Sequence, residues 1–464
     1  MRGMHKHLLL AALVALGLCL FFIWRFPAQP DDTALYEELA RNWADHHVYG
    51  LFFNQQLMPV DLRMPGYPAF LVAVYTLFGR TRLAVMLAQA VLEWGTCFLI
   101  AALAARLAPP PQRRRVAITA MWLAATCPFL ANYSAAVLSE VLTTFLATAA
   151  LLVLTEADHN SRALWFLGAL LIGLGTLVRP ETPLLLAAAA LVLVLRWRQP
   201  ADWPKLLRTG ALLAAGFVLP LLPWAARNWY SLHRVQFLAP RYVQLATDFV
   251  PRGFNAWTKT WLVRFRDVYL VPWKLDDEPI RVDDLPASAF DSAEERARVA
   301  ALLEQYNATL DFSPELDRQF GELARERARR HPLRTYLWIP LDRVATLWFT
   351  PRIELLPYSG HLWPLAQRWE DDPVDFSVTV LFGLLNYVYV ALAFAGVWLA
   401  VRRKDHEEPQ ARWALALVVA FLLVRTAFFT RIETPEPRYV LECVPALLAL
   451  SALVWARSSH RQLA

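Results

Sequence analysis

The sequence predicts an all-α polytopic membrane protein with about ten transmembrane helices, outer juxtamembrane helices and an extracytoplasmic, mostly helical cap. Of its 464 residues, 57% are hydrophobic, and the mean hydropathy of +0.33 lies far above that of a soluble domain. The apolar runs are long and continuous, without the alternation that marks a transmembrane barrel. Because an open sheet would leave backbone groups unpaired in lipid, helices are the predicted spanning elements.

Several apolar runs are long enough to cross roughly 30 Å of hydrocarbon. They cover residues 8–26, 83–105, 116–133, 137–155, 163–178, 182–197, 209–226, 376–401, 413–429 and 439–457. No small-residue cleavage site follows the first run, so we expect an uncleaved span rather than a signal peptide.

Basic residues favour one side of the predicted membrane. Arg and Lys are concentrated in the short connections on the side of the N-terminus, as in the run Arg113–Arg115. Under the positive-inside rule this predicts an inner- or plasma-membrane protein with both termini in the cytoplasm. We therefore expect an N-terminal transmembrane domain at 1–226 with an outer loop at 27–82, an extracytoplasmic cap at 227–375 and C-terminal transmembrane helices at 376–464.

The predicted cap contains two helical stretches, 290–310 and 313–332, followed by a segment at 332–351 that mixes Arg and Asp into aromatic sequence. Such a mixture is typical of a helix at the membrane interface. The cap is either part of a functional site or an accessory domain unrelated to chemistry. The net charge of +6 is ordinary for a membrane protein, so we expect the lipid bilayer and no nucleic acid as a partner.

The stretch QPDDTALYEELARNWADHH, residues 29–47, follows the first span directly. Pro30 is a helix breaker, and the apolar residues after it recur at helical spacing, which predicts an amphipathic outer helix. Asp31 or Asp32 would lie at its N-cap, where a carboxylate accepts backbone N–H groups. Capping needs only one aspartate, and Tyr36 lies on the same face four residues after Asp32. The pair therefore indicates either a doubled cap or a chemical role.

The motif RMPGYPAF begins at Arg63. Pro65 and Pro68 bracket Gly66 and Tyr67, which predicts a turn and then a short helix from Pro68 at the outer boundary. Arg63 would be held on this turn beside the acidic helix. The alternative is an interfacial arginine that contacts lipid headgroups.

Other charged residues lie at the outer ends of distant spans. Glu140, Arg227 and Arg438 are all predicted near the same depth as Asp32 and Arg63. Charges at membrane depth are costly unless they are paired or face a wet cavity. Their recurrence at one face therefore predicts a polar site there.

Several familiar chemistries have no support in the sequence. It contains no GxxxxGK[ST], GxGxxG, HExxH or GxSxG motif, so ATP-driven work and serine-hydrolase chemistry are not predicted. The four cysteines lie in apolar stretches without metal-ligand spacing, which indicates core residues. The sequence requires no cofactor, and it leaves a divalent metal ion open without predicting one.

The stretches DDTALYEELARNWADHHVYG and RMPGYPAFLVAVYTLFG resemble the first outer loop of the GT-C superfamily of polyprenyl-phosphate-sugar glycosyltransferases. The closest similarity is to the branch of protein O-mannosyltransferases and lipid A aminoarabinose transferases. Weaker similarities follow in the family's order, at VLSEVLTTF, LVRPETPLLL, WAARNW, RERARRHPLRTYLWIPLDRVATLWF and EPRYVLECVPAL. The resemblance implies a GT-C-like fold.

The resemblance also implies roles for individual residues. The family's catalytic base maps onto Asp32 through its spacing to Tyr36. Many relatives carry Asp-Glu where this chain has Asp31 and Asp32, so the base stays open between the two. Arg63 takes the place of the residue that holds the lipid phosphate. The remaining implied residues are Glu140 as a second outer acid, Arg227 and Arg438 as further phosphate ligands, and Tyr36 and Tyr67 as supporting residues.

The predicted function is transfer of a sugar from a polyprenyl-phosphate donor to a glycan, lipid or protein acceptor at the outer face. A carboxylate can accept the proton of the attacking group, and guanidinium groups can stabilise the leaving lipid phosphate. Two alternatives stay open: a transporter or flippase of an anionic lipid or oligosaccharide, and an oligosaccharide polymerase or ligase. Transporters tend to have repeated halves and charges near the bilayer centre, whereas here the charges gather at one face.

Overall fold

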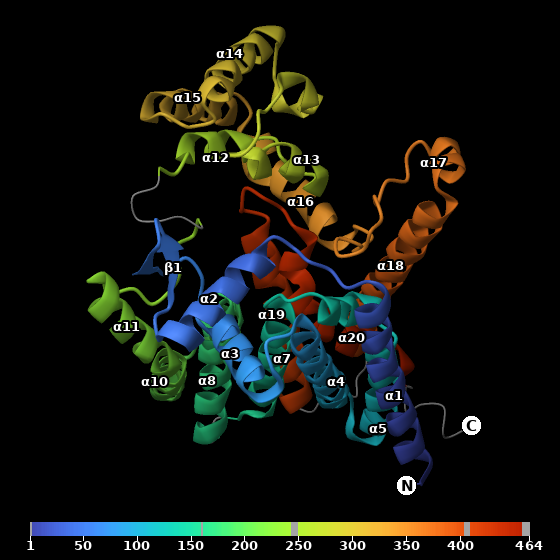
Figure 1. The fold of residues 1–464 in the computed structure, drawn as a ribbon. Coiled ribbons are helices and arrows are strands. Elements are labelled where there is room, and N and C mark those ends of the chain that lie inside the picture. The colour runs from blue at the N-terminus through green and yellow to red at the C-terminus, as the bar shows by residue number, and fades with distance from the viewer. Residues whose placement is uncertain (1, 159–160, 243–248, 403–408, 457–464) are drawn as a thin grey trace. The chain divides into compact units, whose positions relative to one another are not determined.

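A computed structural model describes residues 2–158, 161–242, 249–402 and 409–456, and helices dominate it (Figure 1). The chain forms two compact units. The first comprises Met1–Val243, Pro351–Val424 and Leu441–Ala464, and the second comprises Gln244–Thr350 with Arg425–Val440. The second unit begins later and ends earlier than the predicted cap at 227–375. It also includes residues 425–440, which the sequence did not link to the cap.

The all-α polytopic class is confirmed, and helical structure lies in every range predicted to span the membrane. Among the described residues, six helical stretches are long and apolar enough to cross a membrane, or up to seven if one bent pair counts as a span. The six are Lys6–Arg25, Arg82–Leu107, Pro200–Leu232, Pro373–Arg402, Pro409–Phe429 and Pro437–Trp455. The predicted number is higher because α7 (Glu140–Glu156) and α8 (Arg162–Val178) have 17 residues each and α9 (Leu184–Arg196) has 13, fewer than the roughly 20 that a span needs.

In the first unit, α4 packs against α1, α5 and α7, and α8 packs against α7 and α10 (Figure 1). Its helices outside the first outer segment are α1 (Arg2–Arg25), α4 (Arg82–Leu107), α5 (Arg113–Ala125), α6 (Pro128–Ala131), α7 (Glu140–Glu156), α8 (Arg162–Val178), α9 (Leu184–Arg196), α10 (Trp203–Val218), α11 (Leu222–Leu232), α17 (Leu365–Asp371), α18 (Pro373–Arg402), most of α19 (Pro409–Phe429) and α20 (Val444–Ser451). Cys19, Cys97, Cys127 and Cys443 are buried, as predicted.

The first outer segment consists of α2 (Asp32–His46), the strands β1 (Gly50–Phe53) and β2 (Gln56–Pro59), and α3 (Gly66–Phe78). The two strands form an antiparallel hairpin that pairs Gly50 with Pro59. Its two turn residues, Asn54 and Gln55, have φ of 48° and 67°, the backbone that two-residue hairpins require. The sequence analysis did not predict this hairpin.

Two pairs of charged side chains hold α2 against the turn between α3 and α4. Arg82 donates two hydrogen bonds of 2.8 Å to the carboxylate of Glu37, and Arg80 binds Asp45. Asp31 occupies the N-cap position, as predicted, but the predicted capping hydrogen bond is wrong, because the Asp31 side chain makes none. The third helix begins at Gly66 rather than at Pro68.

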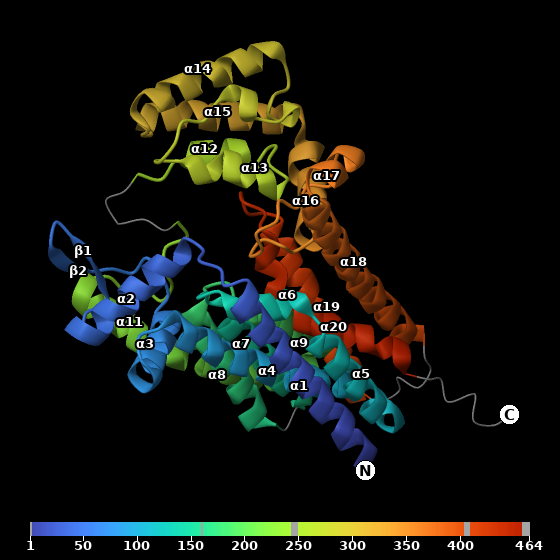
Figure 2. The same cartoon turned by 45° about the vertical axis from the view of Figure 1, so that its right-hand side comes forward.

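The second unit contains α12 (Arg252–Thr258), α13 (Phe265–Leu270), α14 (Ala293–Thr309), α15 (Pro314–Arg330), a π-helical turn at Arg334–Trp338 and α16 (Ile339–Trp348). Figure 2 shows α15 between α14 and α12, with which it makes contacts. Its core is rich in aromatic residues, among them Phe254, Trp257 and Phe320. The hydroxyls of Ser292 and Ser313 accept backbone N–H groups at the starts of α14 and α15, as N-caps do.

A network of charged residues stabilises the second unit. Arg327 is fully buried and binds Glu295, and its side chain also donates to Thr260 Oγ1 at 2.9 Å. Asp291 accepts from Arg334 at 2.6 Å and lies 3.2 Å from Arg330. A buried guanidinium needs such partners, since an unpaired buried charge is costly.

Candidate active site

Asp32 and Arg63 form an ion pair at the head of α2. Arg63 Nη2 donates to Asp32 Oδ1 at 2.5 Å. The side chains are 25% and 26% exposed for Arg63 and Asp32, respectively, so solvent-borne groups can reach both. The Nε atom of Arg63 is buried and has no hydrogen-bond partner in the part of the chain that the structure describes. The guanidinium therefore has donors beyond the one that Asp32 uses.

Two tyrosines lie beside this pair. The Arg63 guanidinium lies over the ring of Tyr36, 5.8 Å from its centroid, and the Tyr36 and Tyr67 rings meet edge to face at 4.9 Å. Tyr67 Oη donates to Gln89 Oε1 at 2.7 Å, and Gln89 in turn donates to the Ala136 carbonyl at 2.7 Å. Burial raises the pKa of the Tyr36 phenol above its ordinary value. Tyr36 is therefore a neutral hydroxyl at physiological pH, held by packing that links α2 to α4.

Glu140 is the first residue of α7 and is only 3% exposed. Its Oε1 accepts from Arg179 Nη1 at 2.6 Å, and Arg179 Nε also donates to Glu181 at 2.6 Å and lies 3.9 Å from Glu442. Three carboxylates from distant parts of the chain thus surround one guanidinium. A buried acid such as Glu140 is tolerated because it has this partner.

Hydrogen bonds join the start of α2, and the segment before it, to the segment that precedes α7. Thr33 Oγ1 donates to the Val137 carbonyl at 3.1 Å, and the Ala28 N–H donates to the Ala135 carbonyl at 2.9 Å. Asp32 directly precedes Thr33, and Glu140 lies three residues after Val137. Both acids also act electrostatically on the buried Tyr36 hydroxyl. The structure therefore brings Asp32, Arg63, Tyr36, Tyr67 and Glu140 into one region.

Arg227 lies elsewhere in the first unit, and its guanidinium binds backbone carbonyls at the two ends of the hairpin. Its Nη1 donates to the Val60 carbonyl at 2.8 Å and its Nη2 donates to the Tyr49 carbonyl. The guanidinium also lies over the rings of Tyr49 and Trp224. Tyr49 Oη donates to the Arg63 carbonyl at 2.9 Å. Arg227 thus supports the backbone that carries Arg63, and the structure shows no contact between Arg227 and Asp32.

The two remaining predicted residues are Asp31 and Arg438. Asp31 is exposed, and we find no ion pair for it within the described ranges. Arg438 belongs to the second unit, where its Nε donates to Glu436 Oε2 at 2.5 Å.

Some residues of the site were missed by the sequence analysis. Arg179 appeared there only inside a weakly matching motif, and Gln89 did not appear at all. Asp61 is a further one: it lies two residues before Arg63, is 5% exposed and is 3.7 Å from Arg234. A polar residue inside an apolar run is the signal that could have revealed Gln89, because such residues are costly in a membrane span.

Comparisons with known proteins agree with the fold. Residues 63–224 match the family model described as dolichyl-phosphate-mannose-protein mannosyltransferase, whereas no curated protein sequence matches significantly. The chain is similar to the archaeal oligosaccharyltransferase AglB from Archaeoglobus fulgidus, solved with an inhibitory peptide and a dolichol-phosphate. That alignment has 13% identity and a TM-score of 0.51, and it covers 97% of this chain and 50% of AglB.

A second solved structure, ArnT from Cupriavidus metallidurans in the apo state, aligns with 16% identity and a TM-score of 0.39 over 96% of this chain and 77% of ArnT. In the alignment with AglB, the chain spans about half the length of that protein. Residues 63–224 thus match the model of the dolichyl-phosphate-mannose-protein mannosyltransferase family, and the chain is a polytopic membrane protein whose fold is similar to that of AglB.

Proposed function

We propose that this protein transfers a sugar from a polyprenyl-phosphate donor to a glycan, lipid or protein acceptor at the periplasmic or lumenal face of the membrane. The observation that carries the proposal is the part-exposed ion pair of Asp32 and Arg63. The reaction needs a base that deprotonates the acceptor and a cation that binds the leaving phosphate. The Asp32 carboxylate can be the base, and the Arg63 guanidinium can be the cation. The dolichol-phosphate bound to AglB supports a lipid phosphate as the donor class.

In the proposed reaction, the acceptor oxygen or nitrogen attacks the anomeric carbon of the donor sugar. Asp32 accepts the proton that the attacking atom loses, which is general base catalysis. The bond between the anomeric carbon and the phosphate oxygen breaks, and its electron pair goes to the lipid phosphate. Negative charge therefore grows on the phosphate in the transition state, where a preorganised guanidinium is most effective.

Arg63 is the proposed phosphate ligand. The further N–H groups of its terminal nitrogens can donate to phosphate oxygens as a fork. The stacking on Tyr36 and the bond from Tyr49 to its carbonyl restrict how far the residue can move. Preorganisation of this kind lowers the cost of binding.

Glu140, Arg179 and Arg227 are proposed as positioning residues. Arg179 fixes the Glu140 carboxylate next to the head of α2, so Glu140 acts on the base and on Tyr36 through its charge. Arg227 holds the hairpin carbonyls instead of meeting the donor. We assign the site to the extracytoplasmic face, with both termini in the cytoplasm, on the distribution of basic residues between the predicted connections.

The test is a transfer assay with the purified protein in lipid nanodiscs. A radiolabelled sugar on polyprenyl phosphate is mixed with candidate acceptors, and the release of free polyprenyl phosphate is measured. We expect Asp32→Asn to reduce turnover by roughly 100-fold or more, as loss of a general base does, and Asp31→Asn to retain most of it. Both variants should keep the unfolding temperature of the native protein.

Three results would contradict the proposal in different ways. Full turnover in Asp32→Asn with loss in Asp31→Asn would move the base by one position. Full turnover in both variants would remove the base from this helix. Movement of labelled lipid across the bilayer without release of polyprenyl phosphate would indicate a flippase instead.

A further inference from the structure

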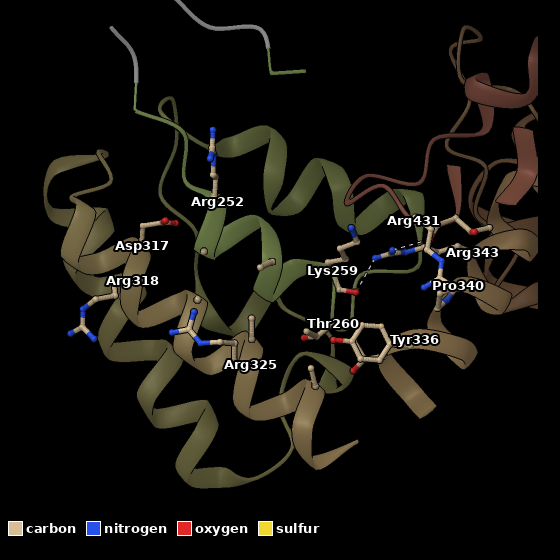
Figure 3. Close-up of a pocket in the computed structure, with 17 residues that line it drawn as sticks. Arg252, Lys259, Thr260, Asp317, Arg318, Arg325, Tyr336, Pro340, Arg343 and Arg431 are labelled. Carbon is tan, nitrogen blue, oxygen red and sulfur yellow. Dashed lines mark hydrogen bonds between the residues drawn. The ribbon is translucent and has the colours of Figure 1, made fainter. Parts of the chain in front are cut away.

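The second unit contains a cavity of about 540 Å³ that is separate from the site described above. Its walls come from α12, α15, the π-helical turn with α16, and residues 430–431 (Figure 3). The cavity lies within the size range of small-molecule sites, roughly 300–1,000 Å³. All of its lining residues belong to this one unit.

A glycine of α12 lets α12 and α15 approach closely at this cavity. A Cβ atom on Gly253 would lie 1.9 Å from the Asp317 carbonyl oxygen and 2.8 Å from the Gly321 nitrogen. The helices can therefore meet backbone to backbone only with glycine at position 253. The crossing places Asp317, Arg318 and Arg325 of α15 at the same cavity as Arg252 of α12.

The charge of the cavity is strongly positive. Among the described residues, Asp317 is the only acidic one that lines the cavity, and its Oδ1 accepts the Phe254 N–H at 2.9 Å. The basic lining residues are Arg252, Lys259, Arg318, Arg325, Arg343 and Arg431 (Figure 3).

Some of these cations have carboxylate partners and some do not. Arg318 binds Glu315 at 2.6 Å, and Lys259 lies 4.0 Å from Glu433. Arg252, Arg325 and Arg431 are exposed, and none of them forms an ion pair with another residue in the described ranges. The structure thus leaves several positive charges at one cavity without an internal counter-ion.

Arg343 is the strongest sign that the cavity is built to hold an anion. Its side chain is 1% exposed, yet its partners are all backbone carbonyls: Nε donates to Leu262 at 2.9 Å, and the terminal nitrogens donate to Thr430 and Lys259 at 3.2 Å. These bonds use three of the N–H groups of a guanidinium and leave two. Burial lowers the pKa of Arg343 to about 10, so it stays charged at neutral pH.

We propose that this cavity binds a phosphate group carried on a sugar-sized molecule. Uncompensated guanidinium groups match a phosphomonoester better than a carboxylate, because the phosphate carries roughly two charges and three acceptor oxygens. The cavity is large enough for the sugar beside the phosphate. Phosphate binding here is independent of the proposed transfer reaction, since no residue of the Asp32 site is involved.

The test is calorimetric titration of the full-length protein in nanodiscs with glucose 1-phosphate and with inorganic phosphate. The protein carries Arg63→Gln throughout, so that the proposed donor site does not contribute. We expect saturable binding, weakened about tenfold by Arg325→Gln and about tenfold by Arg431→Gln, since each removes one charge-assisted hydrogen bond. Arg325 and Arg431 are exposed and form no ion pair in the described ranges, so we expect both variants to fold. Arg343 is buried and is therefore left unchanged.

Arg298→Gln is the matched control, because Arg298 is an exposed arginine of the same unit that binds Glu326 outside the cavity. It should leave the affinity unchanged. Equal weakening by Arg298→Gln, or no saturable binding in the parent protein, would overturn the proposal. A second set of nanodiscs that contain phosphatidic acid, a lipid phosphomonoester, separates the sources. Competition with glucose 1-phosphate that Arg325→Gln relieves assigns the phosphate to a lipid headgroup, and absence of competition assigns it to a soluble or glycan-borne phosphate.

Discussion

Arg63 is the residue on which the proposed reaction depends most closely. Its guanidinium binds Asp32 through one nitrogen, while its buried Nε is unused. A lysine at this position would keep the charge but would present a single ammonium group, which cannot form two parallel hydrogen bonds to a phosphate. Arg63 would therefore recognise the arrangement of the phosphate oxygens as well as their negative charge.

We expect Arg63→Lys to lower kcat/KM for the polyprenyl-phosphate sugar by about 10- to 100-fold, because the lost fork acts on the leaving phosphate. Steady-state kinetics at several donor concentrations measure it. Arg80→Lys is the control, since Arg80 is an exposed arginine of the same outer segment that binds Asp45. Unchanged kinetics in Arg63→Lys, or an equal loss in Arg80→Lys, would exclude this role.

Single residues also show where the sequence predicts the site and where it cannot. Asp32 and Arg63 are 31 positions apart, and a helix followed by a proline-containing turn was enough to predict them as neighbours. Arg179 could not be assigned in the same way, because its partners Glu140, Glu181 and Glu442 come from three distant segments. Arg227 lies at the end of a span as predicted, but its carbonyl partners at Tyr49 and Val60 depend on a hairpin without a strong turn motif.

Among the helices and strands, the crossing of α12 and α15 has a steric requirement that can be measured. Gly253 cannot carry a Cβ atom, since it would overlap the Asp317 carbonyl. Gly321 differs, because a Cβ atom there would lie 3.4 Å from the Gly253 Cα and 3.6 Å from Arg325, which is ordinary contact distance.

We therefore expect Gly253→Ala to lower the free energy of unfolding by about 2 kcal/mol, as overpacking does. Gly321→Ala should be neutral or stabilising by up to about 1 kcal/mol, because alanine favours a helix interior. Denaturant unfolding followed by tryptophan fluorescence reports on this unit, whose core contains Trp257 and Trp261. The reverse order of stability would show that α12 and α15 do not cross in this way.

Helices could be predicted better than strands for a physical reason. Continuous apolar runs such as 83–105 become helices such as α4 with bounds that differ by one or two residues, because lipid requires every backbone group to be bonded within the segment. The hairpin of β1 and β2 has no such requirement, and its turn of Asn54 and Gln55 lacks the glycine that usually marks one. Three of the predicted spans correspond to apolar helices of 17, 17 and 13 residues, α7, α8 and α9.

Across the whole molecule, the chain folds as two units, each with apolar packing and buried charged groups. The second unit contains a network of acids and arginines around Asp291. Burial alone would raise the pKa of Asp291, but the hydrogen bond from Arg334 and the charges of Arg327 and His331 outweigh it and hold the pKa below its ordinary value. The ionised form of Asp291 is therefore favoured by folding.

This lowered pKa predicts a loss of stability in acid. The contribution of Asp291 is fully present above the ordinary carboxyl pKa of about 4 and is lost as the pH falls through the lowered value. Unfolding of the second unit, measured at pH 7, 5, 4 and 3, should become easier only at the acidic end. Asp291→Asn should be less stable at pH 7 and should lose less between pH 5 and 3 than the native protein. The same acid dependence in Asp291→Asn and in the exposed control Asp311→Asn would assign the effect to other groups.

The pairing of Asp32 with Arg63 also bears on the order of events in catalysis. Without a donor, the Asp32 carboxylate accepts a hydrogen bond from the Arg63 guanidinium. A donor phosphate that draws Arg63 toward itself would free that carboxylate oxygen at the moment when an acceptor must be deprotonated. The proposed enzyme would thus be prepared by its donor, with the donor binding before the acceptor.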